Sequence, residues 1–449
     1  MPELGKIPPH DIEAEQAILG SMLTDKDAVV SALEVLKEDS FYREDNKAVF
    51  AAIQQLYNKN EPIDIITVKA ELIEQGNFER VGGIEYLAGL PERVPTTANV
   101  EKYIKIVEEK AMLRDLIQMS NEFIALGYDE TEEADAILSA AEKGVFELAQ
   151  KKNAKGYTAL KDILVENFNK LEELYNKKGS VTGIPTGFID FDKKTAGLHN
   201  SDLIILAARP AMGKSAFAVN IATNVAVRSK VPVAIFSLEM SKEQVVNRIL
   251  CSEAMVDSNK VRTGQLDDND WVKLATTVGM ISEAPMYIDD SSDINIMQIR
   301  TKCRKLKTEK NIGLIIIDYL QLIQGTGKKN ATRENEISEI SRSLKILAKE
   351  IDVPVIALSQ LSRGTEKREN KVPMLSDLRE SGSIEQDADI VMFIHREGYY
   401  KPESEDRNLA QVILAKHRAG SIGEVNLTWM GDYTKFVNAE TRYDEEDMI

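Results

Sequence analysis

The sequence of 449 residues has few of the residues that crosslink small proteins or bind metals. Its two cysteines, Cys251 and Cys303, fit neither a disulfide framework nor a zinc motif. Both fall in helical patterns, so we expect them to be packing residues. The four histidines form no cluster with metal-ligand spacing. These absences argue against a disulfide-rich scaffold and against a structural zinc domain.

Long apolar segments and excess positive charge are also missing. No apolar run approaches the roughly 20 residues of a membrane-spanning helix, and the polar N-terminus has no signal-peptide core. We therefore expect a soluble, cytoplasmic protein that is not associated with a membrane. The formal net charge of −17 argues against nucleic acid as a partner, because lysine and arginine neutralise phosphates. A closed ring can nevertheless have an acidic exterior and a basic channel, so the net charge does not decide the question.

The length allows two or three domains, and residues 1–150 are predicted to form a small all-α domain. Asp11 occupies the N-cap position of a first helix, DIEAEQAILGSML. Further helical patterns cover residues 26–38, 44–58 and 66–75, and the glycines and prolines of residues 81–97 predict a turn-rich break.

Two amphipathic helices, at 99–126 and 131–150, predict a helical hairpin joined near Gly127. Its apolar stripe could pack within the domain or pair with a second copy of the chain, and the pattern does not distinguish these alternatives. Residues 151–180 are predicted to be a linker that contains one strongly amphipathic helix at about 158–177. That helix must bury its stripe on its own domain or on a neighbouring subunit.

Strands alternate with helices through residues 181–449, which predicts an α/β domain with a mostly parallel sheet. The predicted strands are 203–207, 233–238, 313–318, 354–359, 389–394, 410–416 and 423–429. Most are short apolar runs, as expected for a sheet covered on both faces. The close spacing of the last strands predicts an antiparallel extension at one edge.

Residues 203–215, LIILAARPAMGKS, combine an apolar strand, a tight turn and the start of a helix. The N–H groups and dipole of a helix start favour phosphate. Lys214 would reach the β- and γ-phosphates, and the Ser215 hydroxyl would bind Mg²⁺. The common pattern GxxxxGK[ST] begins with glycine, whereas Ala208 stands at that position. An ordinary strand–turn–helix with a surface lysine therefore remains possible on this motif alone.

Three polar residues follow other predicted strands. Because ligands of open α/β sheets bind at the carboxyl ends of strands, these side chains are expected beside the turn at 209–213. Glu239 could polarise a water molecule as a general base, or could instead stabilise the following helix. Asp318 ends the run GLIIID and could hold the water shell of Mg²⁺. Gln360 offers a donor and an acceptor with which to sense a γ-phosphate.

Basic residues mark three further segments. Residues 361–387 form a long irregular stretch with several lysines and arginines, and 325–336 is a second loop. Each could contact a phosphate chain or be an ordinary solvated loop. Lys416 and Arg418 lie two residues apart, so they point the same way on an extended segment. They could act as an arginine finger across a subunit boundary or belong to a basic hairpin turn.

Together these segments resemble the DnaB-type replicative DNA helicases of bacteria, which are hexameric rings with a RecA-like motor. The similarity runs nearly end to end, from PPHDIEAEQAILGSML through ARPAMGKSAFA, FSLEM, IIIDYLQLI, LSQLSR and DLRESGSIEQDAD to KHRAGSIG, in the order of the family. The family has ARPxMGK[ST] at the phosphate loop, so Ala208 is normal for it. The resemblance implies a RecA-like P-loop NTPase domain at 181–449.

The resemblance also implies roles for individual residues. It implies a catalytic set, a nucleotide-binding loop, two metal ligands and a set that contacts single-stranded DNA. The catalytic set is Lys214, Glu239, Gln360, Lys416 and Arg418. The loop comprises Arg209, Pro210, Ala211, Met212, Gly213, Lys214, Ser215 and Ala216. The metal ligands are Ser215 and Asp318, and the DNA-binding set is Arg363, Arg379, Glu380 and Gly382.

The implied function is an ATP- and Mg²⁺-dependent helicase that moves 5′→3′ on single-stranded DNA as a homo-hexamer and unwinds the replication fork. Primase and a helicase loader are the implied partners, and the hairpin would dimerise to give a trimer of dimers. The helix at 158–177 would dock on the next subunit. Two alternatives remain: a DNA-stimulated ring ATPase that does not unwind, and a nucleotide-gated scaffold for primase and loader.

Overall fold

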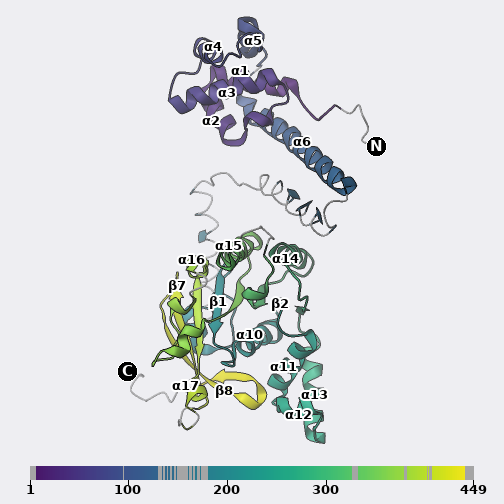
Figure 1. Ribbon diagram of the computed structural model, residues 1–449, viewed down its shortest axis with the longest axis vertical. Helices are drawn as coiled ribbons and strands as arrows, with labels where there is room; N and C mark the ends of the chain where they lie inside the picture. Colours follow the sequence, from purple (N-terminus) through teal and green to yellow (C-terminus); the bar gives the residue numbers. More distant parts are fainter. Residues whose placement is uncertain are drawn as a thin grey trace. The chain divides into compact units, whose positions relative to one another are not determined.

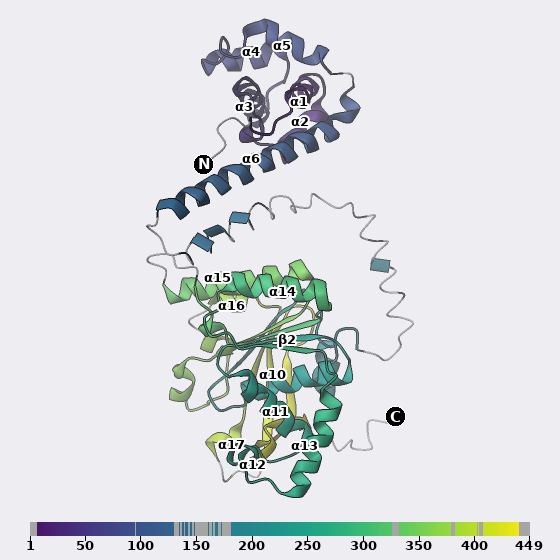
Figure 2. The same ribbon diagram turned by 90° about the vertical axis from the view of Figure 1, so that its right-hand side faces the viewer.

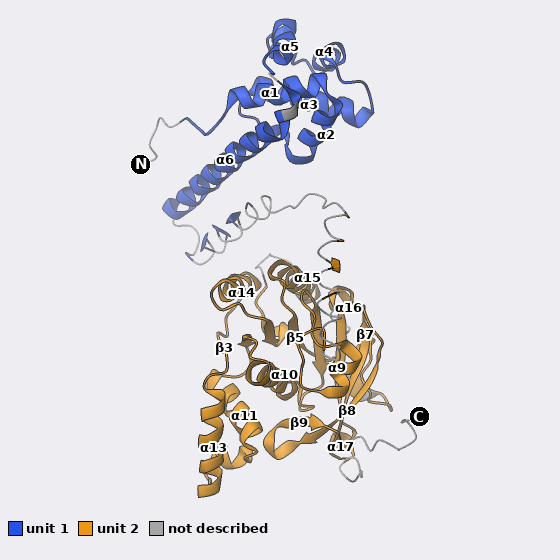
Figure 3. Cartoon of the chain, turned by 180° about the vertical axis from the view of Figure 1, so that it is seen from behind, with its two compact units in different colours: residues 1–158 blue, residues 159–449 orange. Residues whose placement is uncertain are grey.

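The structure, a computed structural model, describes residues 7–94, 96–129, 181–325, 332–378, 382–401, 403 and 407–439, with isolated residues between 134 and 172. The chain forms two compact units, residues 1–158 and 159–449 (Figure 3). In the part of the chain so described, no helix is long and apolar enough to cross a membrane.

The first unit is helical, as predicted. Its helices are α1 (Ile12–Thr24), α2 (Lys26–Val35), α3 (Glu44–Lys59), α4 (Ile65–Glu74), α5 (Gly83–Glu92) and α6 (Val100–Asp129). Asp11 caps α1 as expected, because its side chain accepts a hydrogen bond of 3.0 Å from the Ala14 N–H. The core of this unit is built from the inward faces of these helices, with Ile18, Phe50 and Leu87 among its fully buried side chains.

The prediction of a turn-rich break at 81–97 was wrong, because α5 occupies most of it. Gly82 supplies the left-handed turn before the helix, with φ of 99°. Leu87 and Leu90 are fully buried and pack toward α1, and this packing outweighs the poor helix propensity of the surrounding glycines. Pro91 is accommodated in the last turn. At Gly20 of α1, a Cβ atom would lie 2.3 Å from the Leu90 carbonyl oxygen, so the two helices touch there.

The first helix of the predicted hairpin is present, and it continues through Gly127 instead of ending there. Val100, Ile104 and Val107 of α6 are buried in the unit. Beyond them the helix exposes a series of large apolar side chains: Leu113, Leu116, Ile117, Ile124 and Tyr128. The second predicted helix, at 131–150, and the linker helix, at 158–177, lie mostly outside the described residues, so the hairpin and the linker stay predictions.

The second unit contains a nine-stranded sheet in the order β3-β2-β4-β5-β1-β6-β7-β8-β9. Figure 1 labels β1, β2, β7 and β8 of this sheet. The strands are β1 (Leu203–Ala208), β2 (Val233–Ser237), β3 (Met286–Asp289), β4 (Leu314–Asp318), β5 (Val355–Gln360), β6 (Ile390–His395), β7 (Leu409–His417), β8 (Gly423–Met430) and β9 (Lys435–Asn438). The strands from β3 to β6 in this order are parallel, and β7, β8 and β9 are antiparallel. The parallel sheet and its antiparallel extension are therefore confirmed.

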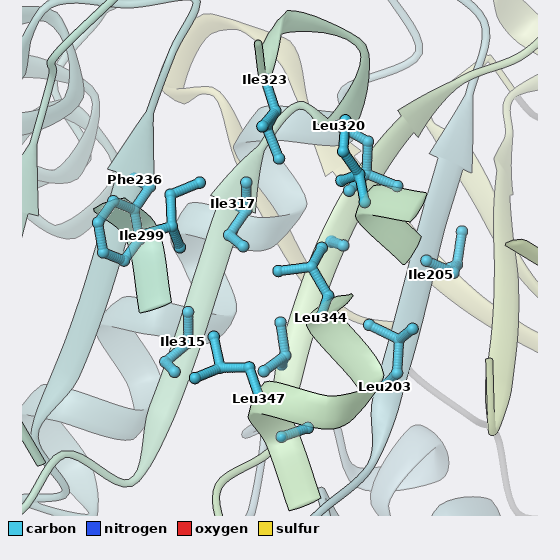
Figure 4. Packing of buried hydrophobic residues seen from close by; sticks show 14 of the residues in the cluster. Leu203, Ile205, Phe236, Ile299, Ile315, Ile317, Leu320, Ile323, Leu344 and Leu347 are labelled. Atoms are coloured by element: carbon cyan, nitrogen blue, oxygen red, sulfur yellow. The ribbon is translucent and has the colours of Figure 1, made fainter. Parts of the chain in front are cut away.

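Helices cover both faces of the sheet (Figure 2). The helices described in this unit are α9 (Ile189–Thr195), α10 (Lys214–Thr223), α11 (Lys242–Ala254), α12 (Ser258–Thr263), α13 (Asp268–Ile281), α14 (Ile296–Lys310), α15 (Arg333–Ile351), α16 (Gly382–Asp387) and α17 (Glu397–Tyr400). Of these, α12 and α13 pack on α11. Leu203 and Ile205 of β1 pack in the cluster that includes α14 and α15 (Figure 4), whereas Ile204 and Leu206 pack in the one that includes α10. Both faces of β1 are thus buried, which explains its uninterrupted apolar run.

The segment predicted to be irregular over 361–387 is more ordered than expected. Single helical turns cover Arg363–Lys367 and Leu375–Leu378, and α16 begins at Gly382. An ion pair between Arg368 and Asp377, at 2.5 Å, ties the middle of the segment together. The prediction missed this order because its basic residues were counted as solvent-facing, whereas Arg368 has a buried partner.

Candidate functional site

A cavity of about 460 Å³ lies at the carboxyl edge of the parallel strands. It is lined by Ala208, Arg209, Pro210, Ala211, Gly213, Lys214, Ser215, Ala216, Glu239, Arg248, Gln360, Trp429 and Thr434. The turn after β1 and the residues after β2 and at the end of β5 are therefore brought together, as the strand-end argument predicted. Met212 is the exception in the turn, because its side chain is buried in the core beneath it.

The turn between β1 and α10 has the backbone of an anion-binding loop. Gly213 is the residue before α10 and has φ of 95°, and a Cβ there would lie 2.8 Å from Cζ of Phe436 on β9. Glycine is thus required both by conformation and by space. Ala208 is simply the buried last residue of β1, where alanine fits as well as glycine. The first residues of α10, Lys214, Ser215 and Ala216, line the cavity, and the free N–H groups of a helix start stabilise an anion.

Lys214 is a largely buried cation of the site. Its Nζ lies 3.4 Å from Asp318 Oδ1 and 4.3 Å from the centre of the Tyr319 ring. Burial lowers the pKa of Lys214 below its ordinary value, and the nearby carboxylates of Asp318 and Glu239 oppose this shift. A group that carries compensating negative charge, such as a phosphate, would remove the cost of holding a buried ammonium.

Asp318, at the end of β4, has an incompletely used carboxylate. Its Oδ1 is buried, and apart from the ion pair with Lys214 no described group donates a hydrogen bond to it. A buried oxygen with spare acceptor capacity suits a hard cation. Among the residues that the structure describes, no three histidine, cysteine or carboxylate side chains gather as a metal cage. A cation here would therefore take most of its ligands from water and phosphate, which is the habit of Mg²⁺.

Glu239 lies two residues beyond β2 and lines the cavity. The next helix, α11, is capped independently of it by a capping box, in which the side chains of Ser241 and Gln244 each accept a hydrogen bond from the other's backbone N–H. The carboxylate of Glu239 is thus not needed as a helix cap. This removes the main structural explanation for a glutamate at the end of a buried strand.

Arg248 is a member of the site that the sequence reasoning missed. It projects from α11 to the cavity, and burial lowers its pKa while Asp318 and Glu239 oppose the shift. Trp429 and Thr434, from the antiparallel extension, form another wall. No local pattern in the sequence marks these three residues, because their helix and hairpin reach the cavity only through the tertiary fold.

Gln360 contacts the turn that follows β4, and Arg209 connects the cavity to the segment that follows β5. The Gln360 N–H donates to Gln321 Oε1 at 3.4 Å, and Gln321 Nε2 donates to Ser359 Oγ at 2.9 Å. Arg209 lines the cavity, but its guanidinium donates to Glu366 Oε1 at 2.6 and 3.0 Å and to the Leu361 carbonyl at 2.8 Å. Arg209 therefore ties the phosphate loop to the segment that follows β5.

Lys416 and Arg418 are not in this cavity. Lys416, on β7, pairs with Val391 near the start of β6, and Val391 in turn pairs with Ile205 of β1. The end of β7 is thus at the amino edge of the parallel strands, about 10 Å across and about 10 Å along the sheet from the end of β1. Both cations lie together, as predicted, but they cannot reach the phosphate loop of their own chain.

Of the predicted DNA-binding set, only part can be located. Gly382 is exposed and is the first residue of α16. Arg379 and Glu380 lie outside the described residues, as does the side chain of Arg363.

Comparisons with known proteins connect this geometry to one family. The family model for the DnaB-like helicase C terminal domain matches residues 183–438, and that for the N terminal domain matches residues 7–109. The chain belongs to the DnaB-like helicase family. As a member it is an ATP-dependent replicative DNA helicase, so the predicted fold class and activity are confirmed.

Individual members of the family are similar to this chain over nearly its whole length. The chain is 50% identical over 440 residues to the replicative DNA helicase DnaC of Bacillus subtilis (strain 168), covering 98% of this chain and 97% of that one. It is 44% identical to the replicative DNA helicase DnaB of Pasteurella multocida (strain Pm70), covering 99% and 97%. A solved DnaB-like replicative helicase, described with its interactions with primase, is 35% identical with a TM-score of 0.76 over 96% of this chain and 100% of that chain.

Proposed function

We propose that this DnaB-like helicase works as a homo-hexameric ring that moves 5′→3′ along single-stranded DNA and separates the strands of a replication fork. The observation that carries the proposal is the division of its charged groups between two edges of one sheet. Lys214, Asp318 and Glu239 lie at the carboxyl edge, and Lys416 and Arg418 lie at the amino edge. One subunit thus presents an incomplete nucleotide site at one edge and cations at the other, which suits head-to-tail assembly.

In this proposal the phosphates of ATP rest on residues 209–216, with Lys214 on the β- and γ-phosphates. Ser215 and Asp318 would hold Mg²⁺, which neutralises phosphate charge when bound. Glu239 accepts a proton from the attacking water, whose oxygen forms the new bond to the γ-phosphorus as the bond to ADP breaks. Gln360 senses the γ-phosphate through its amide. The guanidinium of Arg418 and the ammonium of Lys416 reach the nucleotide of the neighbouring subunit.

For DNA, we propose that Arg363, Arg379, Glu380 and Gly382 belong to the strand-contacting segment. Support comes from the exposure of Gly382 at the start of α16, where backbone can approach a phosphate chain. Primase and a helicase loader are the proposed protein partners, by analogy with the relative described with primase. The proposed role in replication implies a cytoplasmic location.

The test is unwinding of a forked duplex with ATP and Mg²⁺, comparing free 5′ and 3′ tails. Wild type should separate the strands only when a 5′ tail is present, and Glu239→Ala should bind nucleotide without unwinding. Glu243→Ala, which removes an exposed glutamate of α11, is the matched control and should keep wild-type activity. ATPase stimulated by single strands without unwinding would favour the ring ATPase, whereas no effect of DNA would favour the scaffold.

A further inference from the structure

The two cations at the amino edge are held by a defined set of oxygen atoms. Lys416 Nζ donates to the carbonyls of Glu385 and Gln386 in the last turn of α16. Arg418 Nη2 donates to the Gln386 carbonyl at 2.5 Å, and Arg418 Nε lies 3.7 Å from Asp389 Oδ1. We call these two carbonyls and the Asp389 carboxylate the cation cradle.

Asp389 is the fixed point of the cation cradle. It is 8% exposed, and its Oδ2 accepts a hydrogen bond of 2.8 Å from the Leu203 N–H at the start of β1. The same oxygen pairs with Lys345 Nζ of α15, which also donates to the Ser201 carbonyl at 2.8 Å. The carboxylate is thus anchored to the central strand and to a long helix, leaving Oδ1 facing Arg418. The Arg418 backbone is fixed to the same residue, because its N–H donates to the Asp389 carbonyl at 2.9 Å.

Arg418 needs such an anchor because its side chain is 52% exposed at the end of a strand. A free arginine samples many rotamers, and ordering it costs conformational entropy. A group that acts across a subunit boundary must be held close to its productive direction, since a displacement of about 1 Å can cost about 10²-fold in rate. The cation cradle removes that freedom before the subunits meet.

We infer that Asp389 is a positioning residue which, with the last turn of α16, aims Lys416 and Arg418 at the neighbouring subunit's nucleotide. The inference rests on the proposed function, in which these cations act across the boundary. It adds a residue outside the predicted site and gives α16 a role. Because α16 begins at Gly382, the proposed DNA contact and the aim of the cations depend on the same short helix.

The first test is the steady-state ATPase of Asp389→Asn rings with single-stranded DNA. The amide keeps an oxygen for the Leu203 N–H but loses the charge that faces Arg418. We expect kcat to fall about 10²-fold and KM to stay within about twofold. Glu350→Gln is the control, because it removes a carboxylate of α15 that pairs with Arg300 and Arg304 of α14 rather than with a group of the cation cradle. Both variants should lose similar thermal stability, and only Asp389→Asn should lose kcat; equal kcat in the two would overturn the inference.

Mixed rings separate positioning from damage within the variant subunit. Asp389→Asn subunits keep their own Lys214 and Glu239, so a neighbour with an intact cation cradle should restore hydrolysis at their site. Co-expressed Asp389→Asn and Glu239→Gln subunits should therefore hydrolyse ATP faster than the sum of the separate rings. Arg418→Ala with Glu239→Gln should behave in the same way.

The two mixtures also distinguish the failures. Rescue of Arg418→Ala without rescue of Asp389→Asn would overturn the role of Asp389 and leave the proposed function intact. Rescue of neither would remove the cross-subunit assignment itself. If Asp389→Asn does not yield folded rings, Ser383→Ala tests the α16 side of the cation cradle. Ser383 of α16 donates a hydrogen bond of 2.6 Å from its Oγ to Ser338 Oγ of α15, and the substitution removes this link between the two helices. Its kcat should fall several-fold and recover in the same mixture, and a wild-type kcat would contradict the inference.

Discussion

Lys214 shows how a single residue can be predicted from sequence while its energetics cannot. The motif and its position after a buried strand place it correctly at the start of α10. The motif says nothing of Asp318 Oδ1 at 3.4 Å or of the Tyr319 ring beside the ammonium, since these residues come from the end of β4. Arg248 was missed for the same reason: VVNRIL has the pattern of an ordinary helical segment, and only the path of α11 brings its guanidinium to the cavity.

The lowered pKa of Lys214 predicts how nucleotide binding responds to pH. Because burial favours the neutral amine, the free protein loses this proton at a lower pH than an exposed lysine would. Affinity for ATP should therefore weaken as pH rises from about 7 to about 10. Lys214→Arg should show a flatter response, because a guanidinium stays protonated, and Lys214→Ala should lose ATPase activity.

Titrating a fluorescent ATP analogue into the three proteins across this range checks the prediction. Parallel curves for wild type and Lys214→Arg would show that some other group controls the pH response. Full ATPase activity in Lys214→Ala would remove the phosphate-loop assignment.

At the scale of elements, long apolar patterns were predictable and short ones were not. Every predicted strand of the second unit is present. β1, β2, β4, β5 and β6 have the apolar run of strands buried on both faces, whereas β7 and β8 bury alternate side chains. β3 and β9 were missed, since each has only four residues. α5 was missed because its glycines and proline were taken as signs of a turn. Its two buried leucines pack on α1, and this packing makes the segment helical.

The contact between α1 and α5 predicts a sharp difference between two glycines. Gly20→Ala should destabilise the protein by about 1–3 kcal/mol, because its Cβ would meet the Leu90 carbonyl at 2.3 Å. Gly89→Ala, in α5 with open space around it, should stabilise by about 0.5–1 kcal/mol. Chemical denaturation of the full chain measures both, and equal effects would mean that the helices do not meet at Gly20.

The exposed apolar side chains of α6 favour the second of the two alternatives for the hairpin, pairing with another copy of the chain. Leu116 and Ile117 are 42% and 45% exposed. Leu116→Glu with Ile117→Glu should weaken self-association, because two charges would have to be buried in an apolar contact. Lys105→Gln combined with Lys102→Gln, which changes the net charge equally on the same helix, should leave it unchanged. Sedimentation over a range of concentrations compares the assembly masses of the two double variants. Identical masses would mean that the apolar stripe of α6 packs within one chain.

For the whole molecule, the separation of the two edges predicts that one chain alone is a poor ATPase. Arg418→Ala should abolish most hydrolysis while rings still assemble and bind nucleotide, since the residue lies far from its own phosphate loop. Arg262→Ala, an exposed arginine of α12, is the control. Rates per subunit, measured beside the assembly state, should fall sharply when wild type is diluted into monomers. A monomer that hydrolyses ATP at the ring's rate would refute the cross-subunit interpretation.

In the proposed head-to-tail assembly, the opposite placement of the phosphate loop and the two cations sets how many nucleotide sites can be active at once. In an open chain of subunits joined head to tail, the subunit at one end always lacks a donor, so the number of complete sites is one less than the number of subunits. Only a closed circle completes them all. A breach wide enough to admit a DNA strand would therefore silence one nucleotide site at the breach, and closing it would restore that site.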